Sequence, residues 1–341
     1  MLINVDLSDS SVVIPKTEIK EMISVTKVGD KTKVKINSSS LGVIQECKRK
    51  SKYLLLDGWK MDTEAPATVF GSAIHKAMEV FYSGEIADRK LPKLEDMELM
   101  SYGHKVRGED SDLVLRATRA FIERAVQLQP LPETDKRSIQ NGVWILWYYF
   151  SAFIDDGYKA YVDENGPFVE RQFTFTLYED ANLIVEYFGQ IDFVLQNIKT
   201  GDLIPGDHKT SSMVGADFFN RLKPNHQYTG YLMGAKEVFK LDTDKFMVNC
   251  IEVKAKPKTK AGKPPNFPRQ ITTRDKNDFA EFKDSVVQAV REYLYARETG
   301  LWPIGHVNAC AMYGGCSYLS VCSAPDSLRE NVLKSKFIQG K

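Results

Sequence analysis

Two acids and a lysine in the middle of the chain have the types and spacing of a metal-dependent hydrolytic site. Asp192 ends a Gly-Gln-Ile-Asp segment, and Asp207 and Lys209 lie two residues apart in Gly-Asp-His-Lys-Thr. Residues two apart on a strand face the same side, and a hairpin can bring the first acid beside the second. Paired carboxylates bind Mg²⁺ or Mn²⁺, and an adjacent ammonium orients water or stabilises charge on a phosphoryl oxygen. Taken alone, an Asp-x-Lys on a strand is more often an exposed salt bridge than a catalytic site.

Two predicted helices carry further candidates. His75 lies four residues before Glu79, so both stack on one helix face, and the small residues 71–73 allow this helix to approach other backbone closely. Gln227 and Tyr231 are also four residues apart. A lone helical histidine is usually structural or exposed, and the second pair by itself is an ordinary amphipathic pattern.

The cysteines suggest a second metal centre. Cys310, Cys316 and Cys322 follow one another with five residues in each interval, and Cys47 lies far upstream. Four thiolates are the ligands of either a zinc ion or an iron–sulfur cluster. Cys250 lies in an apolar predicted strand and is most simply a core residue.

A basic segment supplies positive charge that the whole chain lacks. The chain has 46 basic and 45 acidic residues, net +1, whereas residues 254–276 hold eight basic residues against Asp275, a local +7. Pro and Gly favour a mobile loop that could follow a phosphate backbone; a solvated surface loop is the alternative. The basic residues are Lys254, Lys256, Lys258, Lys260, Lys263, Arg269, Arg274 and Lys276.

The elements that must position these side chains follow from hydrophobic periodicity. Residues 168–177 alternate as a strand, 183–187 and 190–195 are consecutive or kinked strand segments around Gly189, and 197–201 form a turn into a return strand over 203–208. Further strands are predicted over 246–253, 269–273 and, at the start, near 33–36. Helices are predicted from residue 38 and over 67–81, 113–128, 138–160, 225–239 and 276–299.

Composition excludes several classes of protein. With 341 residues, 43% of them hydrophobic, the chain can bury a proper core. The longest apolar run, Val143–Ile154, is about twelve residues, short of the roughly 20 that span a bilayer, so no membrane protein is expected. The first residues lack a secretion signal, which favours the cytoplasm. Five cysteines are too few for a disulfide scaffold at this length.

The order of these motifs resembles the RecB-type branch of the PD-(D/E)XK nuclease superfamily. Between Gly71 and Tyr231 the chain reads Gly-x-x-x-His-x-x-x-Glu, Gly-x-Ile-Asp, Asp-x-Lys-Thr and Gln-x-x-x-Tyr. The four motifs in this order are far more specific than any one of them alone. It implies an α/β fold with a restriction-endonuclease-like core, a mixed sheet flanked by helices, with helical insertions and a C-terminal cysteine cluster.

The resemblance also implies roles for single residues. His75, Asp192, Asp207 and the main-chain carbonyl of His208 would bind Mg²⁺ or Mn²⁺, and Lys209 would position or activate the attacking water. Gln227 and Tyr231 would contact the nucleic acid near the scissile phosphate. Glu170, just before the first long strand, resembles a recurrent acid of the family that assists catalysis.

The chain departs from the family at one position. The middle residue of Asp-x-Lys is commonly aromatic or aliphatic there and is His208 here. Its side chain is expected on the opposite face from Asp207 and Lys209. We interpret it as a packed, hydrogen-bonded histidine; a proton-handling or DNA-contacting role is the alternative.

The cysteine pattern looks like the iron–sulfur staple of AddB-type helicase-nucleases and of CRISPR-associated adaptation nucleases. This likeness implies a [4Fe-4S] cluster on Cys47, Cys310, Cys316 and Cys322 that clips the two ends of the nuclease domain together. Intervals of five residues are longer than those often seen in such staples, so a zinc ion bound by the same cysteines remains the alternative.

These inferences predict a metal-dependent DNA nuclease, an exonuclease on single strands or duplex ends, that acts in recombination, repair or phage DNA metabolism. The alternatives are a nuclease-like subunit that binds DNA without cutting it and a zinc-stapled interaction protein. No Gly-x-x-x-x-Gly-Lys-[Ser/Thr] occurs, so a helicase or recombination protein would be a separate partner.

The predicted organisation is a lead-in over 1–37 and one domain over 38–341, with a helical insertion (85–165), a catalytic sheet core (168–253), a basic loop (254–268) and a cysteine segment (306–325).

Overall fold

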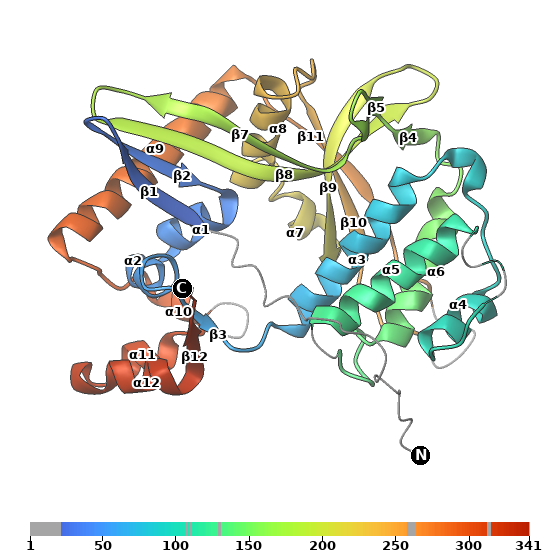
Figure 1. Cartoon of the computed structure of the whole chain (residues 1–341), viewed down its shortest axis with the longest axis horizontal. Coiled ribbons are helices and arrows are strands. Elements are labelled where there is room, and N and C mark those ends of the chain that lie inside the picture. The colour runs from blue at the N-terminus through green and yellow to red at the C-terminus, as the bar shows by residue number, and fades with distance from the viewer. Residues whose placement is uncertain are drawn as a thin grey trace.

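An eight-stranded mixed sheet with helices on both faces forms the body of the protein (Figure 1). The computed structural model describes residues 22–340 except 107, 109–110, 129–130, 258–262 and 312–314. The strand order is β1-β2-β8-β9-β10-β11, and β4 and β7 also pair with β8. The β2–β8 and β9–β10 pairs are parallel, and the other pairs are antiparallel. The predicted α/β fold, a mixed sheet flanked by helices, is confirmed.

The elements follow the hydrophobic periods closely along the central part of the chain. The strands are β1 Ile23–Val28, β2 Lys31–Ile36, β3 Trp59–Met61, β4 Tyr158–Ala160, β5 Val162–Asp163, β6 Gly166–Pro167, β7 Val169–Glu179, β8 Leu183–Asn197, β9 Leu203–Ser211, β10 Lys245–Glu252, β11 Arg269–Thr273 and β12 Phe337–Gln339. The helices are α1 Ser38–Glu46, α2 Lys48–Ser51, η1 Lys52–Leu56, α3 Pro66–Ser83, η2 Ile86–Asp88, α4 Leu94–Ser101, α5 Leu113–Leu128, α6 Ile139–Phe153, α7 Ala216–Phe219, α8 His226–Glu237, α9 Lys276–Thr299, α10 Val307–Ala311, α11 Leu319–Ser323, η4 Asp326–Leu328 and α12 Arg329–Lys336.

Two hydrophobic clusters lie on opposite sides of the sheet. One cluster joins β1, β2, β7 and the first part of β8 to α1, α8 and α9. The other joins β9, β10 and the last part of β8 to α3, α4, α5 and α6, which form the helical layer on the right of Figure 1. In the part of the chain that the structure describes, no helix combines the length and the apolar character needed to cross a bilayer.

The long strand β8 passes from one cluster to the other. Leu183, Val185, Tyr187 and Ile191 pack in the first cluster, whereas Phe193 and Leu195 pack in the second. The regular alternation of side chains between the two faces is therefore interrupted between Ile191 and Phe193, next to Asp192. Along one edge of β8, β2 pairs with residues 183–187 and β9 pairs with residues 193–196. Neither strand pairs with residues 188–192, where β2 and β9 separate from each other.

Three differences from the sequence predictions affect the main sheet. The stretch expected as a lead-in contains a hairpin, β1–β2, whose second strand joins β8. The two predicted strand segments around Gly189 are one continuous strand. The helix expected over 138–160 ends at Phe153, because Gly157 adopts a left-handed φ of 75° and Asp156 accepts a hydrogen bond from the Tyr158 amide, which starts β4.

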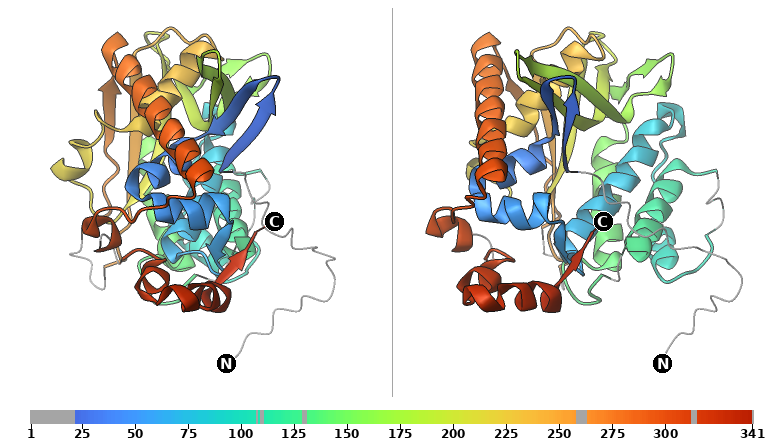
Figure 2. Two further views of the ribbon diagram at one scale, coloured as in Figure 1. Left: turned by 90° about the vertical axis from the view of Figure 1, so that its left-hand side faces the viewer. Right: turned by 60° about the vertical axis from the view of Figure 1, so that its left-hand side comes forward.

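A third, small cluster joins segments far apart in sequence. Strand β3 pairs with β12, and Tyr53 of η1 packs with Tyr318 and Phe337. Figures 1 and 2 both show α11 and α12 beside the segment that contains α2 and β3. An early segment, residues 53–61, and the C-terminal segment therefore meet in one module.

Candidate active site

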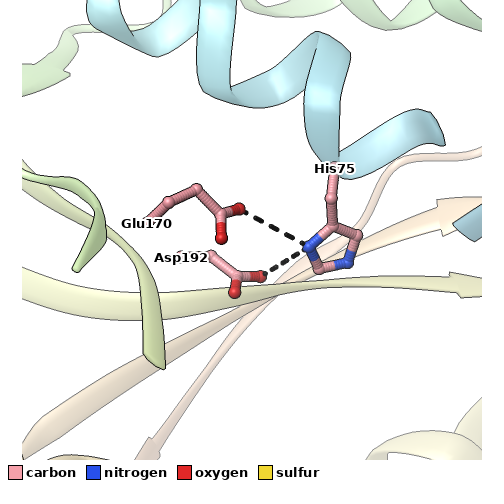
Figure 3. Close-up of side chains that lie close together, drawn as sticks. All are labelled: His75, Glu170 and Asp192. Carbon is pink, nitrogen blue, oxygen red and sulfur yellow. Dashed lines mark ion pairs between the residues drawn. The ribbon is translucent and has the colours of Figure 1, made fainter. Parts of the chain in front are cut away.

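Three side chains from three different elements converge where β8 changes its partners (Figure 3). His75 of α3 places Nδ1 3.3 Å from Asp192 Oδ2 of β8 and 3.7 Å from Glu170 Oε1 of β7. One ligand atom from each residue lies within 4.8 Å of the other two. The side chain of Asp192 is 7% exposed, whereas that of His75 is 30% exposed and leaves the group open to solvent.

The local backbone explains this convergence. A Cβ at Gly71 would lie 3.3 Å from Thr210 Oγ1, so the small residue lets α3 lie close to β9, as the sequence indicated. Glu170 has a left-handed φ of 53°, a conformation that residues with side chains rarely adopt. Gln190 donates a hydrogen bond to its carboxylate and holds it over the sheet. Glu79, in contrast, pairs with Lys76 on the outer surface of α3.

Burial and mutual charge set the protonation of this group. Burial alone would lower the pKa of His75, but the charge of Asp192 and the hydrogen bond with Glu170 outweigh it and raise that pKa to about 9. Burial raises the pKa of Asp192 to about 7; the charges of Asp207 and Glu170 add to this rise, and His75 opposes it. In the absence of a cation the group therefore retains protons at neutral pH, and a divalent cation would displace them.

Asp207 and Lys209 form an ion pair beside this group. Lys209 Nζ lies 2.6 Å from Asp207 Oδ2, and both belong to β9, where they face the same side. Gln227 Nε2 of α8 lies 3.5 Å from Asp207 Oδ1. Burial alone would lower the pKa of Lys209, but the Asp207 carboxylate reverses this and the pKa is raised. Lys209 is therefore a cation at neutral pH, which donates hydrogen bonds and does not accept a proton.

The structure thus joins His75 and Asp192, as predicted, with Glu170 as the third member. The carboxylate of Asp207 is engaged by Lys209 instead. Two carboxylates and an imidazole within 4.8 Å are a donor set that fits Mg²⁺ or Mn²⁺.

Comparison with known proteins identifies the family. A family model described as the PD-(D/E)XK nuclease superfamily matches residues 35–323. The chain belongs to the PD-(D/E)XK nuclease superfamily. A search of curated proteins found no match. Enzymes of this superfamily use Mg²⁺ or Mn²⁺. The donor set of His75, Glu170 and Asp192, here named the acidic group, agrees with this.

In this nuclease, the residue between Asp207 and Lys209 points away from both. The His208 ring packs against Phe193, with centroids 4.7 Å apart, and against Tyr82, at 5.6 Å. Its Nδ1 lies 2.7 Å from Asn249 Nδ2, and burial lowers the pKa of the ring. The interpretation as a packed, hydrogen-bonded histidine is confirmed. Its backbone N–H donates to Asp192 Oδ2 at 2.7 Å and so fixes that carboxylate.

A buried polar network behind His208 was not predicted. Asn249 also contacts Tyr149 Oη at 2.5 Å, Tyr149 and Tyr82 hydroxyls lie 2.8 Å apart, and Arg269 donates to Tyr82 Oη at 2.6 Å. The Arg269 guanidinium forms an ion pair with Asp156. These residues come from four different elements, α3, α6, β10 and β11, and from the loop after α6. They share no sequence motif, so the sequence carried no signal for the network. Gln190 could have been found, because it lies two residues before Asp192 on one strand face.

The predicted DNA-contacting residues have different surroundings. Tyr231 is 9% exposed and lines a cavity beside the acidic group. In the basic segment, Lys256 forms an ion pair with Glu98, and Arg274 is buried, hydrogen bonded to Thr229. With Arg269 also engaged, the positive surface is smaller than the sequence count of +7 suggested.

Among the other lysines of the basic loop, the Lys254 backbone carbonyl accepts a hydrogen bond from Asn141, and Lys263 lies at the edge of the described residues. Lys258 and Lys260 lie outside the described residues.

Two of the four candidate cysteines, Cys316 and Cys322, pack against the small cluster of the module that joins the early and C-terminal segments. Burial raises the pKa of Cys322, and the charges of Cys47, Cys316 and Cys310 contribute to the rise. Cys47 Sγ accepts a hydrogen bond from the Gly305 amide at 3.2 Å, which links the early and late segments. The fifth cysteine, Cys250, is fully buried in β10, as expected of a core residue, and burial raises its pKa to about 12.

Proposed function

We propose that the protein is a metal-dependent deoxyribonuclease that acts as an exonuclease on single strands or duplex ends. The observation that carries this proposal is the convergence of His75, Glu170 and Asp192 beside the Asp207–Lys209 pair. The setting would be recombination, repair or phage DNA metabolism, with any helicase supplied by a separate chain.

The proposed division of labour follows from the charges. His75, Asp192 and Glu170 would hold Mg²⁺ or Mn²⁺, with Asp207 and the His208 carbonyl as further candidates from the family resemblance. When bound, the ion supplies charge neutralisation at the phosphate and activation of water. The protonated Lys209 donates hydrogen bonds to a water or to a phosphoryl oxygen, and Asp207 keeps it protonated and oriented. Gln190 keeps the Glu170 carboxylate turned towards His75.

Cleavage of end-labelled DNA tests this proposal. Single-stranded and duplex substrates are incubated with Mg²⁺, Mn²⁺ or EDTA, and label release from the ends is compared with internal cutting. Lys209→Ala should abolish metal-dependent release. Lys223→Ala is the matched control, because Lys223 also pairs with an aspartate, Asp278, but its side chain is exposed on the surface. Binding without metal-dependent cleavage of any DNA would overturn the proposal in favour of a non-cleaving subunit.

We further propose that Cys47, Cys310, Cys316 and Cys322 hold a [4Fe-4S] cluster. Support comes from the packing of Cys316 and Cys322 against one small cluster, from the effect of Cys47, Cys316 and Cys310 on the pKa of Cys322, and from the β3–β12 pair, which joins an early segment to the C-terminal one. A cluster with ligands from both segments would add a covalent constraint to that pairing.

Anaerobic purification followed by iron, sulfide and zinc analysis tests the cluster. The wild-type protein should be brown, and Cys47→Ser should lose colour and iron and unfold at a lower temperature. Cys250→Ala, outside the cysteine module, should retain both metal and colour. Colourless protein with stoichiometric zinc would refute the cluster and support a zinc staple.

A further inference from the structure

A cavity of about 310 Å³ lies beside residues 188–190 of β8, between the part of β8 that pairs with β2 and the part that pairs with β9. Its size is that of a small ligand pocket, for which about 300–1,000 Å³ is usual. Lys35 of β2, the start of α1 at Ser38 and Ser39, and Tyr231 of α8 line it together with residues 188–190 of β8. It is thus bounded by elements of both the hairpin and the central sheet.

The lining combines an aromatic ring with a cation. Phe188 is half-buried, and Lys35 Nζ lies 5.1 Å from the centroid of its ring. Lys33 is paired with Glu186, whereas no anion is assigned to Lys35 among the described ion pairs. An aromatic face beside a lysine is the combination that binds unpaired nucleotides, because the base stacks on the ring and the cation attracts the phosphate.

The cavity is connected to the acidic group along one strand. Phe188, Gln190 and Asp192 are every second residue of β8, so their side chains share one face of the strand. Gln190 both lines the cavity and donates a hydrogen bond to Glu170. At about 3.3 Å per strand residue, Phe188 lies about 13 Å along the strand from Asp192. This length corresponds to about four nucleotides at the stacked rise of about 3.4 Å, and to fewer in an extended strand.

We propose that this cavity binds an unpaired nucleotide of the DNA strand, with the base stacked on Phe188 and its phosphate at Lys35, a few nucleotides from the scissile phosphate. The inference rests on the proposed nuclease function and deepens it, since it makes single-stranded DNA the substrate that the site engages. A base in a duplex has both faces stacked and cannot enter the cavity without leaving its pair.

Binding without metal tests the inference separately from cleavage. The probe is a fluorescein-labelled dT₁₂ strand in EDTA, followed by fluorescence anisotropy, with a blunt duplex for comparison. Phe188→Ala should weaken binding of the single strand by about 5- to 150-fold, the range of one base–aromatic stack, and leave duplex binding unchanged. Phe188→Trp should restore binding, and its additional fluorescence should be quenched by the probe. Lys35→Ala should lower the salt dependence of binding by about one phosphate contact.

Tyr295→Ala is the matched control, because this aromatic side chain is 60% exposed on α9, outside the cavity. It should leave binding unchanged. If wild type does not bind dT₁₂, or if Phe188→Ala binds as tightly as Tyr295→Ala, the inference is overturned even where metal-dependent cleavage is found. If the Phe188 effect is present but no DNA is cleaved with any metal, the nuclease proposal fails and the nucleotide site stands.

Discussion

Replacing Asp192 with asparagine should remove a loss of stability that the metal-free protein shows as the pH rises through neutrality, while it abolishes metal binding. The carboxyl is nearly buried, and its pKa is raised from 3.8 to about 7, mainly by burial. A group whose pKa is raised on folding contributes stability below its unfolded pKa and loses it as the pH rises through the folded value. Wild type should therefore lose stability between about pH 4 and pH 7, and asparagine, which does not titrate, should not.

The magnitude follows from the same shift. At about 1.4 kcal/mol per pKa unit, the change from 3.8 to about 7 is worth about 4 kcal/mol in total, of which about 3 kcal/mol falls above pH 5. His75 acts in the same direction, because its pKa of about 9 depends on the charge of Asp192 and its stabilisation is lost from about pH 6.5 to 9.

Urea unfolding in EDTA, from pH 5 to pH 8, measures this difference. The free energy of unfolding of Asp192→Asn minus that of wild type should increase by at least about 3 kcal/mol over this range. Asp180→Asn is the control, because the pKa of Asp180 is lowered to about 2 by backbone and side-chain hydrogen bonds, so its contribution is constant above pH 5. A difference for Asp192→Asn that stays constant with pH would show that this carboxyl is not buried as described.

Three further outcomes are expected. The rise in melting temperature caused by Mn²⁺ should grow from pH 6 to pH 9, because the cation competes with protons on His75 and Asp192; equal shifts across this range would contradict it. In urea unfolding, Gly206→Ala should cost about 1–3 kcal/mol, since its Cβ would lie 2.6 Å from the Met247 carbonyl oxygen, whereas Gly42→Ala, with open space around it, should cost nothing. Arg269→Met should cost about 3–5 kcal/mol, because it leaves the Asp156 carboxylate buried without its partner, and adding Asp156→Asn should recover part of that loss; a double variant no more stable than the single one would argue against this pair.

Local patterns in the sequence predicted most of the central fold. The alternation of residues 168–177 and the apolar period of 113–128 each reappear as β7 and α5, the second with identical bounds. Both patterns depend on interactions within a few residues, which composition and spacing express directly. The pairing of Asp207 with Lys209 was predictable for the same reason, since two residues apart on a strand share a face.

Other features depend on contacts between distant segments. Nothing near Glu170 in sequence specifies its left-handed backbone, which lies where β7 pairs with β8 and Gln190 donates a hydrogen bond to its carboxylate. The addition of β1–β2 to the sheet likewise depends on pairing with a strand about 150 residues later, which no local period encodes.

The candidate site thus has two origins. The sequence alone identified which residue types could bind a hard cation and which of them would share a strand face, because side-chain direction follows from backbone period. Only the tertiary structure decided that Glu170 joins His75 and Asp192 while Asp207 turns to Lys209. That choice depends on the pairing of β7 with β8 and on the close approach of α3 to β9, and both are set by packing of the whole sheet between its two helical layers.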